Sequence, residues 1–322
     1  MKGDIIKKIL KKIKRYETIV IARHFGPDPD AICSELALRD AIRENFPSKK
    51  VYAVGTGVSK FRKYGELDRV DVTTLTKPLL ITLDVPNFYR VDGVEGLKYQ
   101  EVIKIDHHPF EEDFGGVEWI CETASSTCQM ITLLLLKGHY QISQNVASNL
   151  FLGIVSDSDR FLLSYTSVDT FQIVTDLIRR TNLPFVSLYE KLYERPIEEI
   201  RFHGYIATHL TVTENGFAYI EISDEILKEY HVDSATPSNM INDFNFMKDI
   251  YVWTFVTYDA KNEVYKVNIR SKGPVINEVA MKYHGGGHKM ASGVRTPNKE
   301  DIEGLLQDLD ETCKKYKESR EK

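Results

Sequence analysis

The sequence contains no hydrophobic run long enough to cross a membrane. Its longest largely apolar stretch is residues 131–136, whereas a spanning helix needs about 20 apolar residues. The basic N-terminal segment, residues 2–15, has apolar runs of only two residues, so it lacks the hydrophobic region of a signal peptide. Cysteine is also scarce, because the four cysteines are far apart and form no CxxC pair. Reduced thiols are the simplest interpretation, and we expect a cytoplasmic protein that does not bind membranes.

Positive charge is not in excess. The chain has 42 Lys and Arg against 47 Asp and Glu, which gives a net charge of −5. A broad basic surface for duplex DNA is therefore not expected. Hydrophobic residues make up 42% and aromatic residues 11% of the chain, which is enough for a packed core and argues against a disordered protein. The length of 322 residues predicts two domains.

The first half of the chain alternates short β-branched runs with helical patterns. Strands are expected at residues 18–22, 51–54, 79–83 and 101–105, and helices at about 30–45, 126–137, 145–156 and 168–180. This alternation predicts a doubly wound α/β domain, with a parallel sheet that is covered on both faces. The apolar positions of residues 5–16 also follow helical spacing. We expect this amphipathic helix to dock on the protein's own core rather than on a membrane.

The pattern changes near Pro184. Residues 186–205 form a helical stretch rich in Glu and Arg, which we interpret as a connector between domains. Alternating strands follow, at about residues 209–213, 217–221, 251–256 and 264–269. The predicted organisation is a parallel-sheet domain over residues 1–185, the helical connector over 186–205, and a smaller α/β domain with a mixed sheet over 206–322.

Acidic and histidine residues follow several of the predicted apolar elements. In chain order they are His24, Asp28, Asp30, Asp84, Asp106, His107, His108 and Asp157. Singly, an aspartate at such a place is usually a turn residue or a helix cap. Together they match the rule that a parallel sheet binds its ligand at the carboxyl ends of its strands. We therefore expect one functional site at this edge of the sheet.

Carboxylates and imidazoles without thiolates are ligands that suit Mn²⁺ or Mg²⁺. Four aspartates and two histidines exceed the needs of one ion, whereas two ions that share one carboxylate would use them all. Two such ions about 3.5–4 Å apart stabilise in-line displacement at phosphorus, with a bridging water or hydroxide as the nucleophile. The expected reaction is hydrolysis of a phosphoester or a phosphoanhydride.

The second half contains a glycine-rich segment, residues 285–293, after a predicted helix at about 275–284. Consecutive glycines let backbone N–H groups converge on an anion, and His288 would add a donor. Arg270 and Ser271 end the preceding predicted strand and would reach the same anion. A glycine triplet alone is more often a flexible turn, but the basic residues beside it favour a phosphate site.

The set of motifs resembles the DHH/DHHA1 phosphoesterase superfamily. The motifs that carry the resemblance cover nearly the whole chain in the family's order: His24-x-x-x-Asp28-x-Asp30, Asp106-His107-His108 and Gly285-Gly286-Gly287-His288. The length and the two-domain plan are similar to the bacterial nanoRNase and pAp-phosphatase group. Those enzymes use Mn²⁺ to degrade RNA fragments of a few nucleotides and to dephosphorylate 3′-phosphoadenosine 5′-phosphate (pAp).

The resemblance implies a role for each site residue. One Mn²⁺ would be held by His24, Asp28 and Asp84, and a second by Asp30, Asp84, His107 and Asp157, so that Asp84 bridges the two ions. Asp106 would support the histidine pair, and His108 would face the scissile phosphate as a charge stabiliser or proton donor. The far end of the substrate would be held by Arg270, Ser271, Gly286, Gly287 and His288.

Two positions depart from the family pattern. Asp159 stands where a glycine is usual, which adds negative charge near the metal edge. Cys33 replaces a small glycine, which concerns helix packing. Ser125 and Ser126 open a predicted helix, and they fit either a position near the phosphate or a capping role.

The leading prediction is a Mn²⁺-dependent phosphoesterase that hydrolyses RNA of roughly two to five nucleotides to 5′-monophosphates and dephosphorylates pAp. Two Mn²⁺ ions are expected, with Mg²⁺ as the alternative metal. The alternatives are a cyclic or linear dinucleotide phosphodiesterase and an inactive homologue that only binds nucleotides. The expected partners are short single-stranded RNA and pAp-type nucleotides, not duplex DNA or a membrane, and the sequence leaves homodimer formation open.

Overall fold

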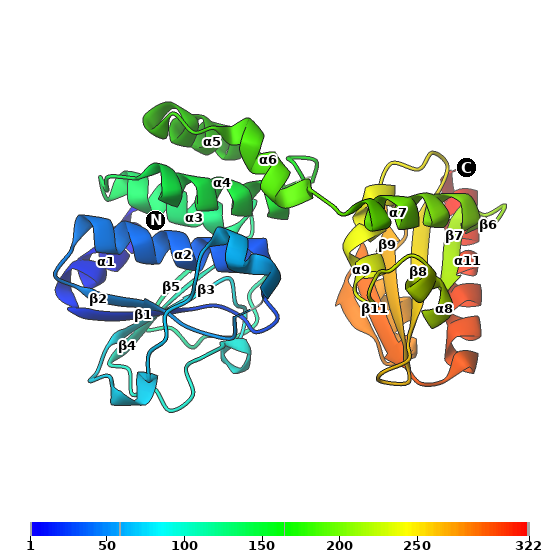
Figure 1. Cartoon of the computed structure of the whole chain (residues 1–322), viewed down its shortest axis with the longest axis horizontal. Coiled ribbons are helices and arrows are strands. Elements are labelled where there is room, and N and C mark those ends of the chain that lie inside the picture. Colours follow the sequence, from blue (N-terminus) through cyan, green and yellow to red (C-terminus); the bar gives the residue numbers. More distant parts are fainter. Residues whose placement is uncertain (1, 58, 164, 321–322) are drawn as a thin grey trace. The chain divides into compact units, whose positions relative to one another are not determined.

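The computed structural model describes residues 2–57, 59–163 and 165–320. The chain divides into two compact units, Met1–Glu194 and Arg195–Lys322 (Figure 1). Each unit has its own sheet and its own hydrophobic core, as expected for domains of this size.

The first unit is built on a five-stranded parallel sheet in the order β2-β1-β3-β4-β5. Its strands are β1 (Thr18–Ala22), β2 (Lys50–Ala53), β3 (Leu79–Leu83), β4 (Glu101–Asp106) and β5 (Val117–Ile120). Because β1 pairs with both β2 and β3, the order of strands reverses at this place, and open α/β sheets bind their ligands at such a switch point. Within this parallel sheet, the short edge strand β5 is the strand that the sequence did not predict.

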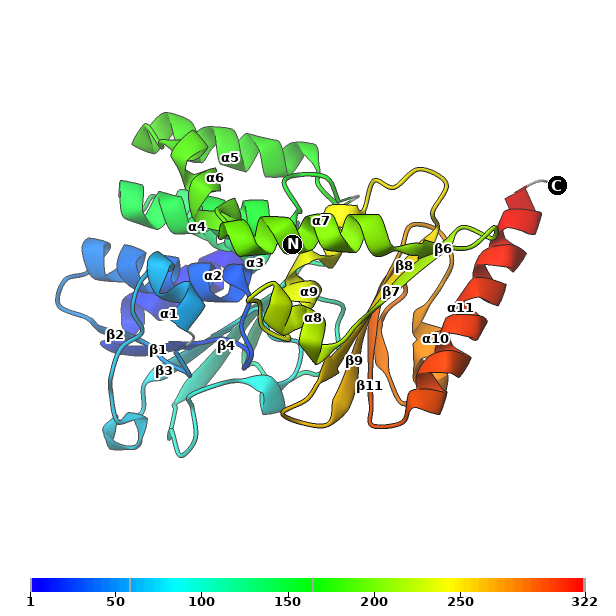
Figure 2. The ribbon, with the colours of Figure 1, turned by 45° about the vertical axis from the view of Figure 1, so that its right-hand side comes forward.

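The α-helices of the first unit lie on one side of this sheet, as Figures 1 and 2 both show. They are α1 (Lys2–Arg15), α2 (Pro29–Asn45), α3 (Thr127–Lys137), α4 (Gln144–Asp157), α5 (Val168–Thr181) and α6 (Phe185–Tyr193), with the 3₁₀ helix η1 (Ser59–Tyr64) near α2. Ile6, Ile9 and Ile13 of α1 are buried in the same core as Ile19 and Ile81 of the sheet. The prediction that the N-terminal helix docks on the protein itself is confirmed.

The other face of the parallel sheet is covered by irregular chain. Val20, Leu80 and Val102 of the sheet pack there against apolar side chains of the connecting segments, which include the 3₁₀ turns η2 (Val72–Thr74) and η3 (Phe88–Arg90). The α/β class and the parallel sheet are confirmed, but this face carries no α-helix among the described residues. Glycine and proline interrupt the segments that cross it, so no sustained helical period forms.

The second unit is a six-stranded mixed sheet in the order β10-β11-β9-β8-β7-β6. Its strands are β6 (Thr211–Val212), β7 (Phe217–Ile222), β8 (Val252–Asp259), β9 (Val264–Ser271), β10 (Gly286–His288) and β11 (Ala291–Thr296). β7 and β8 run parallel, and the other neighbouring strands are antiparallel. The predicted mixed sheet is therefore confirmed.

Helices cover both faces of this second sheet. Their bounds are α7 (Ile197–His209), α8 (Asp224–Glu229), α9 (Thr236–Met240), η4 (Ile241–Phe244), α10 (Asn277–Lys282) and α11 (Lys299–Arg320). One core joins the sheet to α7, α8, α9 and η4, and another joins it to α10 and α11. Figure 2 shows α8 and α9 on one side of the sheet and α10 and α11 on the other.

The helical stretch expected at residues 186–205 is interrupted. α6 belongs to the first unit and α7 to the second, and Pro196 lies between them. Proline lacks an N–H group and disfavours helical backbone at the residue before it, so one continuous helix cannot form there. The strand expected at residues 209–213 shrinks to the two residues of β6, because α7 continues to His209. In the part of the chain that the structure describes, no helix is long and apolar enough to cross a membrane.

Candidate metal centre

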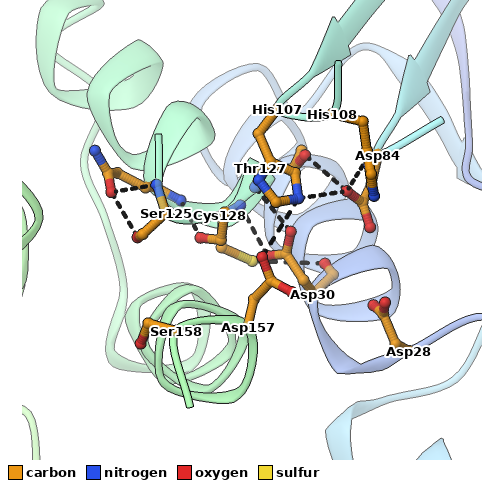
Figure 3. A network of polar contacts seen from close by, with 12 residues as sticks. Asp28, Asp30, Asp84, His107, His108, Ser125, Thr127, Cys128, Asp157 and Ser158 are labelled. Carbon is orange, nitrogen blue, oxygen red and sulfur yellow. Dashed lines mark hydrogen bonds and ion pairs between the residues drawn. The ribbon is translucent and has the colours of Figure 1, made fainter. Parts of the chain in front are cut away.

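The carboxyl edge of the parallel sheet gathers the acidic and histidine side chains of the first unit. The chain segments after β1 and β3, the end of β4 and the end of helix α4 supply His24, Asp28, Asp30, Asp84, Asp106, His107, His108 and Asp157. Figure 3 shows Asp30, Asp84, His107 and Asp157 pointing toward one another. Asp157 comes from a helix end rather than from a strand end. The structure thus brings together the motifs of this half in one place.

His24, Asp28 and Asp84 form one group of potential ligands, whose ligand atoms lie within 4.8 Å of one another. Nε2 of His24 lies 3.6 Å from Oδ2 of Asp84 and 3.9 Å from Oδ2 of Asp28. Nδ1 of His24 lies 3.0 Å from the backbone oxygen of Phe25, which fixes the ring and directs Nε2 toward the carboxylates. Asp28 also caps α2, because its side chain accepts a hydrogen bond from the N–H group of Ala31 over 2.9 Å.

Asp30, His107 and Asp157 form a second group that adjoins the first. Nε2 of His107 lies 3.3 Å from Oδ2 of Asp157 and 3.4 Å from Oδ1 of Asp84. Asp84 therefore faces His24 with one carboxylate oxygen and His107 with the other. Oδ2 of Asp157 is buried and accepts no hydrogen bond from the described residues. Such an oxygen is costly to bury, and a cation would compensate it.

The N-terminus of α3 holds two buried carboxylates of this site. The backbone N–H groups of Thr127 and Cys128 donate to Asp30 over 2.7 and 2.9 Å, and the hydroxyl of Thr127 donates to Asp84 over 3.1 Å. A helix N-terminus favours negative charge, so α3 stabilises both carboxylates in place. The sequence analysis missed Thr127, because a run of capping residues does not indicate which distant carboxylate it will meet.

Ser125 and Ser126 serve α3 itself. Ser126 caps the helix by accepting a hydrogen bond from the N–H group of Gln129 over 3.0 Å. The hydroxyl of Ser125 donates to the side chain of Gln129 over 2.6 Å, and both serines are fully buried. Of the two roles that the sequence left open, these contacts support the structural one.

Burial and neighbouring charges shift the pKa values of the clustered side chains, upward for Asp30, Asp157 and His107 and downward for Asp84. Burial and the neighbouring Asp84 carboxylate raise the pKa of Asp30 to about 7, and burial with the charge of Asp30 raises the pKa of Asp157 well above its usual range. Burial alone would raise the pKa of Asp84, but hydrogen bonds with His107 and His24 outweigh it and lower the pKa. Burial alone would lower the pKa of His107, but Asp84 and the other carboxylates raise it to about 11. The cluster attracts positive charge, which protons or a divalent cation can supply.

His108 is oriented by Asp106. Its Nδ1 lies 2.8 Å from Oδ1 of Asp106 and 3.5 Å from Oδ1 of Asp84, and its backbone N–H group donates to the same Asp106 oxygen over 3.2 Å. Burial would lower the pKa of His108, but the hydrogen bond to Asp106 and the charge of Asp84 raise it. Nε2 of the protonated ring is then the nitrogen that can donate to a substrate.

Arg23, which the sequence analysis did not single out, fixes the backbone that carries His24. The side chain is fully buried and pairs with Asp92 at 2.5 Å. It also donates to the backbone oxygens of His24 and Thr56 over 3.0 and 2.7 Å. A Cβ atom at Gly55 would come within 3.0 Å of Arg23 and of Asp92, so the network needs glycine at that position. Nothing local in the sequence indicates that this arginine is buried.

The donor set fits a divalent cation of the Mn²⁺ or Mg²⁺ type. The clustered ligand atoms are carboxylate oxygens and imidazole nitrogens. Cys33 and Cys128 lie near Asp30, but burial raises the pKa of both thiols well above the usual range. Protonated thiols are poor ligands, so the carboxylates and imidazoles are the donors that this site offers to a metal.

In the second unit, Arg270 and Ser271 are neighbours on β9 and face opposite sides of the sheet. Arg270 is half-buried, donates to the side chain of Asn242 over 2.8 Å, and has its pKa lowered by burial. It forms no ion pair with a carboxylate of the described residues, so it is suited to bind an anion. The hydroxyl of Ser271 is buried and donates to the backbone oxygen of Pro274 over 2.6 Å. The predicted substrate-binding role does not fit Ser271, because alternation along a strand turns it away from Arg270.

The glycine-rich segment is the edge strand β10 rather than an anion-binding loop. His288 lies opposite Ala291 of β11, and Ala291 lies opposite Arg270 of β9, so the three residues share one face of the sheet. Gly287 has a φ of 129°, and a Cβ atom there would meet the backbone oxygen of Ala291 at 2.5 Å. Gly286 is exposed in the same strand. Strand pairing therefore replaces the expected convergence of successive N–H groups.

The two departures from the family pattern have local explanations. Asp159 has a φ of 44°, in the left-handed region that glycine adopts without strain. Its carboxylate accepts a hydrogen bond from Arg160 over 2.8 Å, so the added negative charge is paired. Cys33 is fully buried in the core of the first unit, as expected for a packing role.

The helices beneath the site pack too closely for any side chain at Gly153 of α4. A Cβ atom there would meet Sγ of Cys128 at 2.2 Å and Oδ1 of Asp30 at 2.9 Å. We expect Gly153→Ala to lower the free energy of unfolding by about 1–3 kcal/mol. It should also weaken Mn²⁺ binding, because Asp30 must move. Thermal unfolding and Mn²⁺ titration of the purified variant measure the two effects.

Two further variants control this experiment. Removing Sγ in the double variant Gly153→Ala/Cys128→Ala should restore part of the lost stability, because the closest contact is gone. Gly204→Ala lies on α7, where a Cβ atom meets nothing within 4 Å, and it should raise stability by about 0.5–1 kcal/mol. If Gly153→Ala behaves like the wild type in both measurements, the close packing of α4 on Asp30 is wrong.

Two family models match the chain. One is described as the DHH family, N-terminal domain, and matches residues 18–154; the other is described as the DHHA1 domain and matches residues 216–315. The first match covers the whole parallel sheet, and the second covers the strands of the mixed sheet apart from β6.

Similar proteins match over nearly the full length. A protein of Bacillus subtilis (strain 168) named bifunctional oligoribonuclease and PAP phosphatase NrnA is 33% identical over 96% of this chain and 98% of its own length. A protein of Streptococcus mutans, named probable bifunctional oligoribonuclease and PAP phosphatase NrnA, is 34% identical over 94% of this chain and 97% of its own length. The solved structure of an exopolyphosphatase-related protein from Bacteroides fragilis has a TM-score of 0.82 at 22% identity, over 97% of this chain and 98% of that one. This last likeness shows the α/β fold.

Proposed function

The chain belongs to the DHH family of metal-dependent phosphoesterases, in the bacterial nanoRNase and pAp-phosphatase group, and we propose its substrates and mechanism on that basis. It hydrolyses single-stranded RNA of about two to five nucleotides to 5′-monophosphates, and it removes the 3′-phosphate of pAp. The observation that carries the proposal is the position of Asp84 between His24 of one ligand group and His107 of the other. The B. subtilis relative is named for both activities, which supports the same pair here.

We assign two Mn²⁺ ions to this centre. The first would be held by His24, Asp28 and Asp84, and the second by Asp30, Asp84, His107 and Asp157. When bound, the ions supply Lewis acidity at the scissile phosphate and activate the attacking water. Imidazole nitrogens among the ligands favour Mn²⁺ over Mg²⁺, which prefers oxygen ligands and keeps several waters.

His108 acts on the phosphate from beside the metal ligands. Asp106 holds its Nδ1, so the ring has a fixed orientation and its Nε2 faces away from the carboxylate. The neighbouring charges favour the protonated ring. His108 then stabilises the charge that develops on the phosphate, or it protonates the leaving oxygen.

The second unit binds the other end of the substrate. Arg270 and His288 share a face of the mixed sheet, and Arg270 pairs with no carboxylate of the described residues. We assign a phosphate or the terminal nucleotide to these two side chains, with the open backbone of Gly286 beside them. Gly287 is left out because β11 fills the space around it. Ser271 is left out of this set because its hydroxyl is bound to Pro274.

The alternatives differ in substrate rather than in fold. A cyclic or linear dinucleotide phosphodiesterase would use the same metal centre. An inactive nucleotide-binding homologue would be expected to lack ligands, whereas the two groups contain all six residues that the resemblance assigns to metal. We therefore favour an active enzyme.

The test compares substrates with the full-length protein in Mn²⁺. We expect release of phosphate from pAp and hydrolysis of short RNA at least tenfold faster than of a strand of about 24 nucleotides. The contacts assigned to Arg270 and His288 hold one phosphate or terminal nucleotide, so a longer strand gains nothing further from them. EDTA should abolish both activities, and Mn²⁺ should restore them better than Mg²⁺. Equal cleavage of the longest strand, or turnover of cyclic dinucleotides alone, would overturn the assigned substrates.

A further inference from the structure

The second unit contains a groove of about 490 Å³, of which the proposed chemistry uses only Gly286 at one edge. It runs over β9 and β11 beside α9, and its lining includes Ser234, Lys266, Asn268, Gly286, Gly293 and Arg295. Its volume lies within the range of about 300–1,000 Å³ that is usual for small-molecule sites. All of its lining residues belong to this one unit.

Strand register aligns the groove with Arg270. Side chains alternate along β9, so Lys266 and Asn268 face the same side of the sheet as Arg270. Across β11, Asn268 lies opposite Gly293 and Lys266 lies opposite Arg295. A strand rises about 3.3 Å per residue, which places Lys266 about 13 Å from Arg270 along β9. Stacked nucleotides rise about 3.4 Å each, so this row is longer than one nucleotide.

Charge in the groove is uneven. Lys266 is paired with Asp259 at 2.5 Å and also donates to the hydroxyl of Ser234 over 3.3 Å. Arg295 is exposed and forms no ion pair with the residues that the structure describes. Because Arg295 lies opposite Lys266, this cation stands at the end of the groove farther from Arg270, where the charges of Lys266 and Asp259 offset each other.

The floor of the groove is bare backbone. A Cβ atom at Gly286 would meet nothing within 4 Å, and one at Gly293 would lie 3.1 Å from the backbone oxygen of Val267. Glycine at both positions lets a ribose or a phosphate approach the strands closely. No phenylalanine, tyrosine or tryptophan is among the described residues that line the groove, and His284 is the one ring among them. Stacking on a single ring tolerates any base, so it does not select the sequence.

We propose that this groove binds the sugar–phosphate backbone of the strand beyond the nucleotide held by Arg270 and His288. Arg295 binds the phosphate, and the amide of Asn268 bonds to ribose hydroxyls, irrespective of the base. The inference rests on the proposed function and adds to it the residues that favour short oligonucleotides over pAp.

The test compares two substrates with one variant. In Arg295→Ala, the ratio of kcat/KM for a tetranucleotide to kcat/KM for pAp should fall at least tenfold, mainly through KM of the tetranucleotide, because pAp is too short to fill the groove. Lys314→Ala removes the same charge from α11, on the opposite face of the sheet, and should leave the ratio within twofold of wild type. Tetranucleotides of different base composition should respond to Arg295→Ala equally.

A binding measurement separates this inference from the proposed function. Fluorescein-labelled tetranucleotide is titrated in EDTA, where no turnover occurs, with pAp as the competitor. In one outcome, the wild type turns over neither substrate while Arg295→Ala still weakens binding of the tetranucleotide more than binding of pAp. That result would overturn the proposed function and support the assignment of the groove to oligonucleotide binding. If the wild type is active and Arg295→Ala leaves the kinetic ratio and the relative affinity unchanged, the groove does not bind the substrate.

Discussion

The variant Asp84→Asn is expected to lose on the order of a thousandfold in kcat/KM with both pAp and short RNA, and most of its bound Mn²⁺. The reason is the position of the side chain. Its two carboxylate oxygens face Nε2 of His24 at 3.6 Å and Nε2 of His107 at 3.4 Å. Loss of this single negative charge therefore weakens both ligand groups, whereas removal of Asp28 would affect one of them.

Asparagine is the informative replacement at this position. Asp84 has a φ of 58°, a conformation that asparagine tolerates and alanine does not. The side-chain oxygen of asparagine can still accept the hydrogen bond that the Thr127 hydroxyl donates to Asp84. The variant thus changes the charge and keeps the shape, so that a loss of metal cannot be attributed to a local collapse.

The metal-free variant should also be less stable at neutral pH. Because the pKa of Asp84 is lowered in the folded protein, its ionised carboxylate stabilises the fold above its ordinary pKa of 3.8. That stabilisation disappears as the pH falls through the lowered pKa. The difference in unfolding free energy between wild type and Asp84→Asn should therefore shrink in acid.

Three quantities are measured for each variant. They are the metal content per chain by elemental analysis, kcat/KM in Mn²⁺, and the free energy of unfolding in EDTA. Asp113→Asn is the matched control, because Asp113 is exposed in the same unit. It should keep wild-type metal content and activity. A variant of Asp84 that retains full Mn²⁺ and more than about a tenth of the activity would show that this carboxylate is not shared between two ions.

The sequence could predict the candidate ligands because each stands in a local pattern. β1 and β3 have the predicted bounds. His24 and Asp84 follow the ends of these strands within two residues, so both can be assigned to the carboxyl edge of the sheet from the sequence. The buried face of α1 also depends on neighbours within a few residues. The Asp-Pro-Asp turn likewise predicts a helix cap, although the residue that caps α2 is Asp28 and not Asp30. Predictions from such local patterns hold in the folded protein because the interacting groups lie in the same element or next to it.

Contacts between distant elements could not be predicted in the same way. The N–H groups of Thr127 and Cys128 meet Asp30 across nearly a hundred residues of sequence, and only the packing of α3 on α2 brings them together. Glycines at 285–287 suggest a loop because glycine disfavours strands, yet antiparallel pairing with β11 places two of them, Gly286 and Gly287, in strand β10 together with His288. Tertiary pairing outweighs the local propensity here.

The strongest effect outside the metal centre is expected for Arg270→Ala, which should raise KM for pAp and short RNA by about ten- to a hundredfold. Charge-assisted hydrogen bonds to a phosphate contribute about 1.5–3 kcal/mol, which corresponds to this range. The guanidinium is half-buried and held by Asn242 at 2.8 Å, so it is oriented before the substrate binds. Mn²⁺ content should remain at the wild-type value, because Arg270 belongs to the second unit and the ligands to the first.

Ser271→Ala is the matched control for this prediction, since the two residues are adjacent on β9 and face opposite sides of the sheet. The hydroxyl of Ser271 donates to Pro274 and accepts from the N–H group of Gly273 over 3.1 Å. Its loss should lower the free energy of unfolding by about 1 kcal/mol and leave KM unchanged. Steady-state kinetics, metal analysis and thermal unfolding of both variants distinguish the roles. If Ser271→Ala raises KM as much as Arg270→Ala does, the substrate lies on the other face of the sheet, and the anion site assigned to Arg270 and His288 is wrong.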